Sequence, residues 1–209
     1  MIEVLFFIVL IPSVIIHEVT HGVVALAFGD DTAKKAWRLT LNPIKHVDPI
    51  GTIIVPILML VTVHVAFGWA KPVPVNLSKL RNPRNHGLIV SISGPLVNLA
   101  IAVMAGVGLR IVAPIYTSIY TSVGQLPLIV QLLFLLGFVN VLLAVFNIIP
   151  IPPLDGSALL ERMLPSSWWP QYLRMRMFFL PVVLIVVLMF PGALDAIFNP
   201  ALRIWAHIA

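Results

Sequence analysis

The chain has no cysteine and few charged residues, and both shortages restrict what it can be. Without cysteine, disulfide bonds and thiolate ligands are excluded, so a metal site would have to use histidine and carboxylate side chains. Charged residues make up 10% of the 209 residues, whereas a soluble domain averages about a quarter. Hydrophobic residues make up 60%, and the mean hydropathy is +1.05. The composition therefore predicts an integral membrane protein with the lipid bilayer as its first partner.

The net charge of +5 does not indicate a nucleic-acid partner, because the basic residues lie between apolar runs. Lysine and arginine next to membrane spans explain this charge better. The length corresponds to one domain, and we expect residues 1–209 to form a single integral-membrane unit without an appended soluble module.

Two histidines and a glutamate interrupt the first apolar run, residues 2–28. His17 and His21 are four residues apart, so both imidazoles can reach one metal ion from the same helix face. Glu18 would then lie beside the water that the metal activates and could take its proton. The alternative is a pair of buried histidines satisfied by backbone or water. Polar residues inside a membrane span are costly and usually functional, which favours the metal site.

Five apolar runs are long enough to consider as spans: 2–28, 50–69, 88–109, 128–149 and 177–190, the last of marginal length. If all five crossed, lysine and arginine would divide seven to six between the two sides, without the usual bias. If residues 50–75 instead enter and leave on one face, eleven of the thirteen basic residues share that side. We therefore predict an all-α polytopic protein with about four spanning helices and a re-entrant or extended element near residues 50–76.

A catalytic zinc normally takes a third protein ligand, and few acids lie near apolar segments: Glu3, Asp48, Asp155 and Asp195. Asp155 follows the 128–149 run after prolines that expose the backbone. With re-entry, this run is parallel to the first helix, and Asp155 approaches the two histidines. An ordinary turn is the alternative for Pro-Pro-Leu-Asp-Gly. Geometry and the shortage of other acids favour Asp155 as the ligand.

Several motifs together resemble the site-2 protease family of intramembrane zinc metalloproteases, in particular a compact prokaryotic branch. The motifs are His-Glu-Val-Thr-His at 17–21, Asp-Pro-Ile-Gly-Thr at 48–52, Gly-Trp-Ala-Lys-Pro-Val-Pro-Val-Asn at 68–76, Ser-Gly-Pro-Leu-Val-Asn at 93–98 and the stretch 147–156. The resemblance covers most of the chain. Ser157 differs from it, because a second glycine often follows Asp-Gly, and the chain shows no PDZ or CBS-like domain.

The resemblance implies that His17, His21 and Asp155 bind Zn²⁺ and that Glu18 is the catalytic base. It also implies a multi-pass protein of a prokaryotic plasma membrane with the site toward the cytoplasm. The expected substrates are transmembrane proteins, cut in or near their membrane segments.

A transmembrane substrate must unwind before attack, since its amides are bonded internally and unpaired groups in lipid are costly. The prolines at 72 and 74 predict an extended segment from Trp69 to Asn76 that could pair with the unwound backbone. Trp69, Val73, Val75 and Asn147 are therefore candidate substrate-binding residues. For Asn147, a helix–helix hydrogen bond is an equal alternative.

Two other polar residues have simpler interpretations. Asn98 is interpreted as structural packing, and Lys71 as a cation at the membrane interface. A membrane metal-binding or transport protein and a catalytically silent scaffold are the rival functions. A transporter should show internal repeats, which are absent from the sequence, and an intact Glu18 disfavours a scaffold. The substrate's identity and the oligomeric state stay open.

Overall fold

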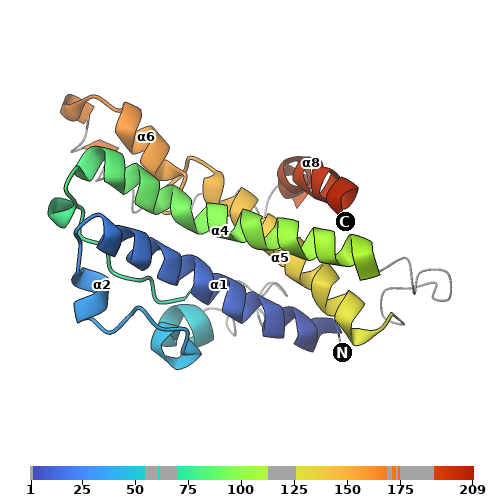
Figure 1. The fold of residues 1–209 in the computed structure, drawn as a ribbon. Helices are drawn as coiled ribbons and strands as arrows, with labels where there is room; N and C mark the ends of the chain where they lie inside the picture. The colour runs from blue at the N-terminus through green and yellow to red at the C-terminus, as the bar shows by residue number, and fades with distance from the viewer. Residues whose placement is uncertain are drawn as a thin grey trace.

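The computed structural model describes residues 2–54, 61, 70–112, 126–168, 171, 172, 174 and 191–209, and all regular elements in these ranges are helices (Figure 1). The longest elements are α1 (Ile2–Ala27), α4 (Pro83–Val112), α5 (Leu128–Ile148) and α8 (Pro191–Ile208). The short ones are α2 (Thr32–Lys35), η1 (Pro43–His46), η2 (Pro49–Ile54), η3 (Leu77–Lys79), α6 (Ser157–Met163) and η6 (Ser166–Trp168). The prediction of an all-α membrane protein is confirmed.

Three helices of the described ranges, α1, α4 and α5, are long and apolar enough to cross a membrane. Their outward faces carry large exposed apolar side chains, as expected for surfaces in contact with lipid tails. These include Val4, Phe7, Ile8, Ile11, Ile89, Leu96, Met104, Leu128 and Ile129. A fourth span is expected at 177–190, which lies outside the described residues.

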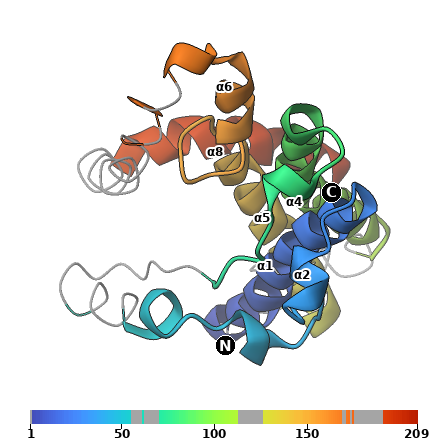
Figure 2. The ribbon, with the colours of Figure 1, turned by 90° about the vertical axis from the view of Figure 1, so that its left-hand side faces the viewer.

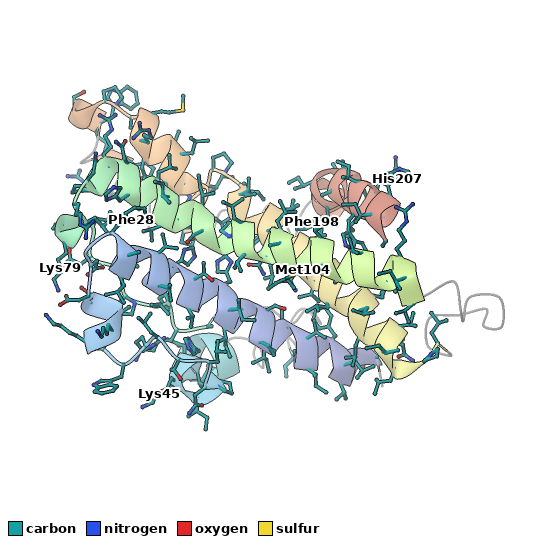
Figure 3. The ribbon with its side chains drawn as sticks, in the orientation of Figure 1. Phe28, Lys45, Lys79, Met104, Phe198 and His207 are labelled. Carbon is teal, nitrogen blue, oxygen red and sulfur yellow. The ribbon has the colours of Figure 1, made fainter. Side chains whose placement is uncertain are left out.

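The helices α1 and α5 run in the same direction, and α4 runs against both (Figure 1). The end of α1 meets the start of α4, where the amide of Arg81 donates to the carbonyl of Phe28 at 3.1 Å. The Phe28 ring stacks on His86 with centroids 4.0 Å apart, and Phe28 and Lys79 lie at this end (Figure 3). The chain between α1 and α4 therefore starts and finishes at one end of the bundle. This connection agrees with the predicted re-entry.

The helix α4 begins at Pro83, five residues before the apolar run 88–109 that predicts it. The side chain of Asn82 accepts a hydrogen bond from the Asn85 amide at 3.2 Å, which is an N-cap contact. Pro83 follows at the first helical position, where its missing N–H is not needed. Capping thus extends the helix beyond the apolar segment.

Residues 70–76 contain no helix, as the prolines predict, and run beside α1 as the green segment of Figure 2. Groups from the preceding polar region hold their backbone. The Lys71 amide donates to the His46 carbonyl at 2.9 Å, and the Arg38 guanidinium donates to the Lys71 carbonyl at 2.7 Å. The Asn76 amide donates to a carboxylate oxygen of Asp30 at 2.6 Å. The extended segment is therefore anchored from 29–46.

The tail after Pro191 forms α8, a helix that the sequence analysis does not predict. Trp205 of α8 packs directly against Gly137 of α5, and its indole N–H donates to the Ala102 carbonyl of α4 at 2.8 Å. The tryptophan thus attaches α8 to α4 and α5 by filling the space beside Gly137. Packing of a single tryptophan is a tertiary feature that hydropathy does not register.

Candidate metal centre

His17, His21 and Asp155 meet inside the helix bundle although 134 or more positions separate the aspartate from the histidines. One potential ligand atom from each lies within 4.8 Å of the other two. Asp155 Oδ2 is 2.9 Å from His17 Nε2 and 3.3 Å from His21 Nε2, and the two Nε2 atoms are 3.1 Å apart. Both histidines are buried and the aspartate is partly buried. The cluster is the single group of this kind found among the described residues.

The second nitrogen of each imidazole faces an acceptor on α4. His17 Nδ1 lies 2.6 Å from Asn98 Oδ1, and His21 Nδ1 lies 2.7 Å from the carbonyl of Val90. A carbonyl oxygen can only accept, so each Nδ1 must carry the proton. Each Nε2 of a neutral imidazole is then an unprotonated lone pair directed at the centre of the cluster. This is the arrangement that metal-binding histidines usually show.

The residues present fit a zinc ion. Three acceptor atoms converge without a hydrogen between them, and Asp155 Oδ2 is buried with no donor among the described residues. Ligands that bind zinc tetrahedrally at 2.0–2.2 Å are separated by about 3.3 Å, close to the spacing of these three atoms. A cation would therefore satisfy all three acceptors at once, and the fourth coordination position would be left for water or substrate.

A tight turn after α5 directs Asp155 back toward α1. The Gly156 amide donates to the Asn147 carbonyl at 2.6 Å, which closes the turn onto the end of the helix. A Cβ at position 156 would lie 2.0 Å from the carbonyl oxygen of Ile148, so no larger residue fits without a backbone shift. The glycine of the Asp-Gly pair is therefore a requirement of the turn that carries the carboxylate.

Gly94 allows α4 to approach the two histidines. A Cβ at this position would lie 2.5 Å from both Cε1 and Nε2 of His21, and 2.6 Å from Cε1 of His17. The glycine of Ser-Gly-Pro thus lies directly against both imidazoles. Together with Asn98 and Val90, it makes α4 the wall that orients the metal-binding rings.

Glu18 lies on α1 between the histidines, and its carboxylate contacts the extended segment. The backbone amide of Val73 donates to Glu18 Oε2 at 2.9 Å. The Val73 side chain is buried, and a Cβ at Gly22, one turn after Glu18, would lie 2.8 Å from it. The extended segment therefore holds the glutamate side chain in place.

The four candidate substrate-binding residues have different surroundings. Val73 packs against α1, and its amide donates to Glu18. Val75 is partly exposed, and its amide makes no hydrogen bond within the described chain. The Asn147 side chain donates to the Leu143 carbonyl of its own helix at 3.0 Å, and it makes no hydrogen bond to another helix of the described ranges. Trp69 lies outside the described residues.

Several residues around the histidines were not predicted from the sequence. Asn98, interpreted as packing, contacts His17 and also donates to Asn140 Oδ1 of α5 at 2.7 Å. Asn140 was not considered, although an amide in an apolar run is itself a functional signal. Gly94 belongs to a motif of the resemblance, but the sequence did not indicate its contact with the imidazoles. The Val90 contact uses a backbone carbonyl, which every residue has, so no sequence signal could have identified it.

The chain is similar to proteins described as zinc metalloproteases. The profile of peptidase family M50 matches residues 110–190. Over 170 residues the chain is 41% identical to the "putative zinc metalloprotease YwhC" of Bacillus subtilis, covering 77% of this chain and 69% of that protein. It is 30% identical over 151 residues to the "putative zinc metalloprotease Rip2" of Mycolicibacterium smegmatis, covering 71% of this chain. The chain spans about half the length of Rip2, 53% of that protein. No solved structure matches.

Proposed function

Since this chain belongs to peptidase family M50, the site-2 protease family, and is a zinc metalloprotease, we propose that it cleaves transmembrane proteins within the membrane. The observation that carries the proposal is the position of the His17, His21 and Asp155 cluster. Both histidines belong to α1, a helix long and apolar enough to span a bilayer. A peptide bond cut at this cluster would lie inside or at the edge of the membrane.

His17, His21 and Asp155 are the proposed zinc ligands, supported by the convergence of their three acceptor atoms. Zinc, when bound, lowers the pKa of water in its open position toward about 7 and polarises the scissile carbonyl. The protein contributes ligand atoms held by α4 and by the turn after α5. Because hydrogen bonds from α4 and within the turn already orient these groups, little reorganisation is needed for the reaction.

Glu18 is the proposed general base. One carboxylate oxygen, Oε2, accepts the Val73 amide, which holds the side chain in one orientation. The other oxygen has no donor among the described residues and can accept a proton from water. Glu18 would then deliver this proton to the nitrogen of the departing amine.

The extended segment is proposed to receive the unwound substrate, on the grounds that it runs beside the glutamate. The structure limits how it could do so. The amides of Lys71, Val73 and Asn76 already have partners, and the prolines at 72 and 74 have no amide hydrogen. Among residues 71–76, the Val75 amide is the donor without a partner in the described chain, so we propose that it pairs with a substrate carbonyl. Trp69 and Asn147 remain candidates for further contacts with the substrate.

The proposed orientation places the end of the bundle where α1 finishes and α4 begins in the cytoplasm of a prokaryotic cell. The support is electrostatic: the connections at 29–49, 70–87 and 150–176 carry eleven of the thirteen lysines and arginines. Positive charge of short loops is retained on the cytoplasmic side. The helix α1 ends and α4 starts at this end, and α5 runs toward it (Figure 1).

Purified wild type and variants, compared for bound zinc and for cleavage of a reconstituted transmembrane substrate, test the proposal. We expect His17→Ala, His21→Ala and Asp155→Ala each to lower zinc affinity at least about tenfold. Glu18→Gln should retain zinc and lose cleavage, because it removes the base and no ligand. Fragments of natural substrates should appear in membrane proteomics of cells with wild type and be missing with Glu18→Gln. Full zinc binding and activity in Asp155→Asn would show that another residue is the third ligand.

A further inference from the structure

A continuous chain of hydrogen bonds leads away from His17 through all three spanning helices. His17 Nδ1 donates to Asn98 Oδ1 of α4, and Asn98 Nδ2 donates to Asn140 Oδ1 of α5 at 2.7 Å. Asn140 Nδ2 donates to Ser13 Oγ of α1 at 2.9 Å, and Ser13 Oγ donates to the Val9 carbonyl at 2.8 Å. The chain thus returns to α1 one turn before the histidine from which it starts.

Every donor in this chain points away from the candidate metal centre, and a backbone carbonyl determines that direction. The second hydrogen of Asn140 Nδ2 bonds to the Leu136 carbonyl at 2.8 Å. A carbonyl can only accept, so the NH₂ group of Asn140 must face Leu136 and its oxygen must face Asn98. The oxygen of Asn140 requires the NH₂ group of Asn98, whose own oxygen is thereby turned toward His17. His17 must then carry its proton on Nδ1.

The links are shielded from water, which makes the orientation of each amide consequential. Asn98 and Asn140 are 0% exposed and Ser13 is 1% exposed. A reversed amide would oppose two donors at one link and two acceptors at the next, and burial keeps bulk solvent away from both links. Hydrogen bonds in such surroundings are strong, and an unpaired buried group is unfavourable.

We propose that Asn98, Asn140 and Ser13 are positioning residues that select the Nδ1-protonated tautomer of His17 and so present its Nε2 lone pair to zinc. Asn98 acts directly on His17. Asn140 makes no hydrogen bond to either histidine among those described, so it acts through Asn98. The inference rests on the proposed zinc ligation by His17. His21 does not depend on this chain, because its Nδ1 bonds to the Val90 carbonyl, which cannot be reversed.

The effects of substitutions should decrease along the chain. Asn98→Leu removes the acceptor of His17 and should lower zinc affinity about 10–100-fold, the usual effect of losing such a partner. Asn140→Leu should have a smaller effect, because Asn98 can then adopt both amide orientations. Ser13→Ala should have the smallest effect, because the Leu136 carbonyl still orients Asn140. Asn98→Asp keeps an acceptor for His17 Nδ1 and should restore zinc binding even where thermal stability falls.

Gln131→Leu is the matched control. Gln131 is a buried amide on α5 that donates to the Leu126 carbonyl at 2.6 Å and takes no part in the chain from His17. The substitution removes a buried amide from the same helix as Asn140→Leu does. If buried amides only stabilise the bundle, the two variants should behave alike in zinc binding.

The test combines zinc titration against a competing chelator with nitrogen NMR of ¹⁵N-histidine-labelled protein in detergent, freed of metal. His17 signals are assigned by their loss in His17→Ala. We expect one Nδ1-protonated tautomer in wild type, Gln131→Leu and Asn98→Asp, and two tautomers in Asn98→Leu and Asn140→Leu. A single tautomer with wild-type zinc affinity in Asn140→Leu would overturn the inference, and so would an equal loss in Gln131→Leu. Wild type without zinc affinity would count against the proposed function instead, while the tautomers of the metal-free protein would still decide the inference.

Discussion

Gly94 shows how a residue without functional groups can control the metal centre. Its hydrogen occupies the space between α4 and the rings of His17 and His21, where a Cβ would come within 2.5 Å. The rings cannot retreat freely, because Asn98 and the Val90 carbonyl hold their Nδ1 atoms from the same helix. Added volume must therefore move either α4 or the imidazoles.

We predict that Gly94→Ala lowers zinc affinity at least about tenfold although it removes no ligand and no hydrogen bond. The measurement is zinc titration of the purified variant in detergent. Gly108→Ala on the same helix is the control, because its Cβ would meet the flexible Leu133 side chain at 3.3 Å. Zinc affinity unchanged by Gly94→Ala would mean that the contact relaxes without disturbing the histidines.

At the scale of the element, the extended segment 70–76 depends on a carboxylate at its far end. Asp30 accepts hydrogen bonds from the amides of Asn76 and Thr32 and from the Thr32 hydroxyl. Burial alone would raise the pKa of Asp30, but the hydrogen bonds from Thr32 and Asn76 outweigh it and lower the pKa below its ordinary value of 3.8. Folding thus favours the ionised form.

A lowered folded-state pKa gives stability that is present above the unfolded value and is lost as the pH falls through the folded one. We therefore predict that amide protection of residues 70–76, corrected for intrinsic exchange rates, is constant near neutral pH and decreases below about pH 4. Asp30→Asn should weaken protection at pH 7 and remove this dependence. Asp31→Asn is the control: lysines 35 and 79 lower the pKa of Asp31 to about 2, but Asp31 makes no bond to the segment. Equal pH profiles for wild type and Asp30→Asn would refute the prediction.

The same segment supplies a prediction about substrate handling. Val75→Pro removes an amide hydrogen that has no partner in the described chain, so the fold should survive and zinc content should be unchanged. Cleavage of a full transmembrane substrate should decrease severalfold, because an unwound helix needs new backbone partners. A short peptide that is already extended should be affected less. Val75→Ala keeps the donor and should be close to wild type.

The comparison requires cleavage rates of both substrates by wild type, Val75→Pro and Val75→Ala. Normal cleavage of the transmembrane substrate by Val75→Pro would exclude strand pairing through this amide. Loss of zinc from Val75→Pro would show instead that the segment supports the metal centre.

At the scale of the whole molecule, the topology depends on the connection between α1 and α4, which returns to the end of the bundle where it started. The helix α1 ends and α4 starts on one side, α5 runs toward it, and the start of α1 and the end of α4 lie opposite (Figure 1). We predict that cysteines replacing Lys35, Ser78 and Ser167 react with an impermeant thiol reagent from the cytoplasmic side. A cysteine replacing Ser118, outside the described residues, should react from the opposite side.

The native chain contains no cysteine, so the labelling has no background. Labelling with intact cells and inverted vesicles separates the two sides. Reaction of Ser78→Cys from outside in intact cells would require residues 50–69 to cross the membrane completely, and it would contradict the proposed orientation.

The sequence by itself determined the membrane class, the three described spans and the three candidate metal ligands that the fold brings together. These depend on local properties: the length of apolar runs, the spacing of His17 and His21 along one helix, and the shortage of acids that leaves Asp155. Charge counting predicts the topology as well, because lysine and arginine respond to the membrane rather than to particular contacts.

Only the tertiary structure decided what surrounds the histidines. Gly94, the Val90 carbonyl and Asn140 act through distances between helices that no local pattern encodes. The interpretation of Asn98 as packing fell short for this reason, since its partners His17 and Asn140 come from two other helices. The helix α8 was missed because a tryptophan over a glycine stabilises it rather than a long apolar run. The types and spacing of residues can be read along the chain, whereas the orientation of the His17 and His21 imidazoles depends on the helix that packs beside them.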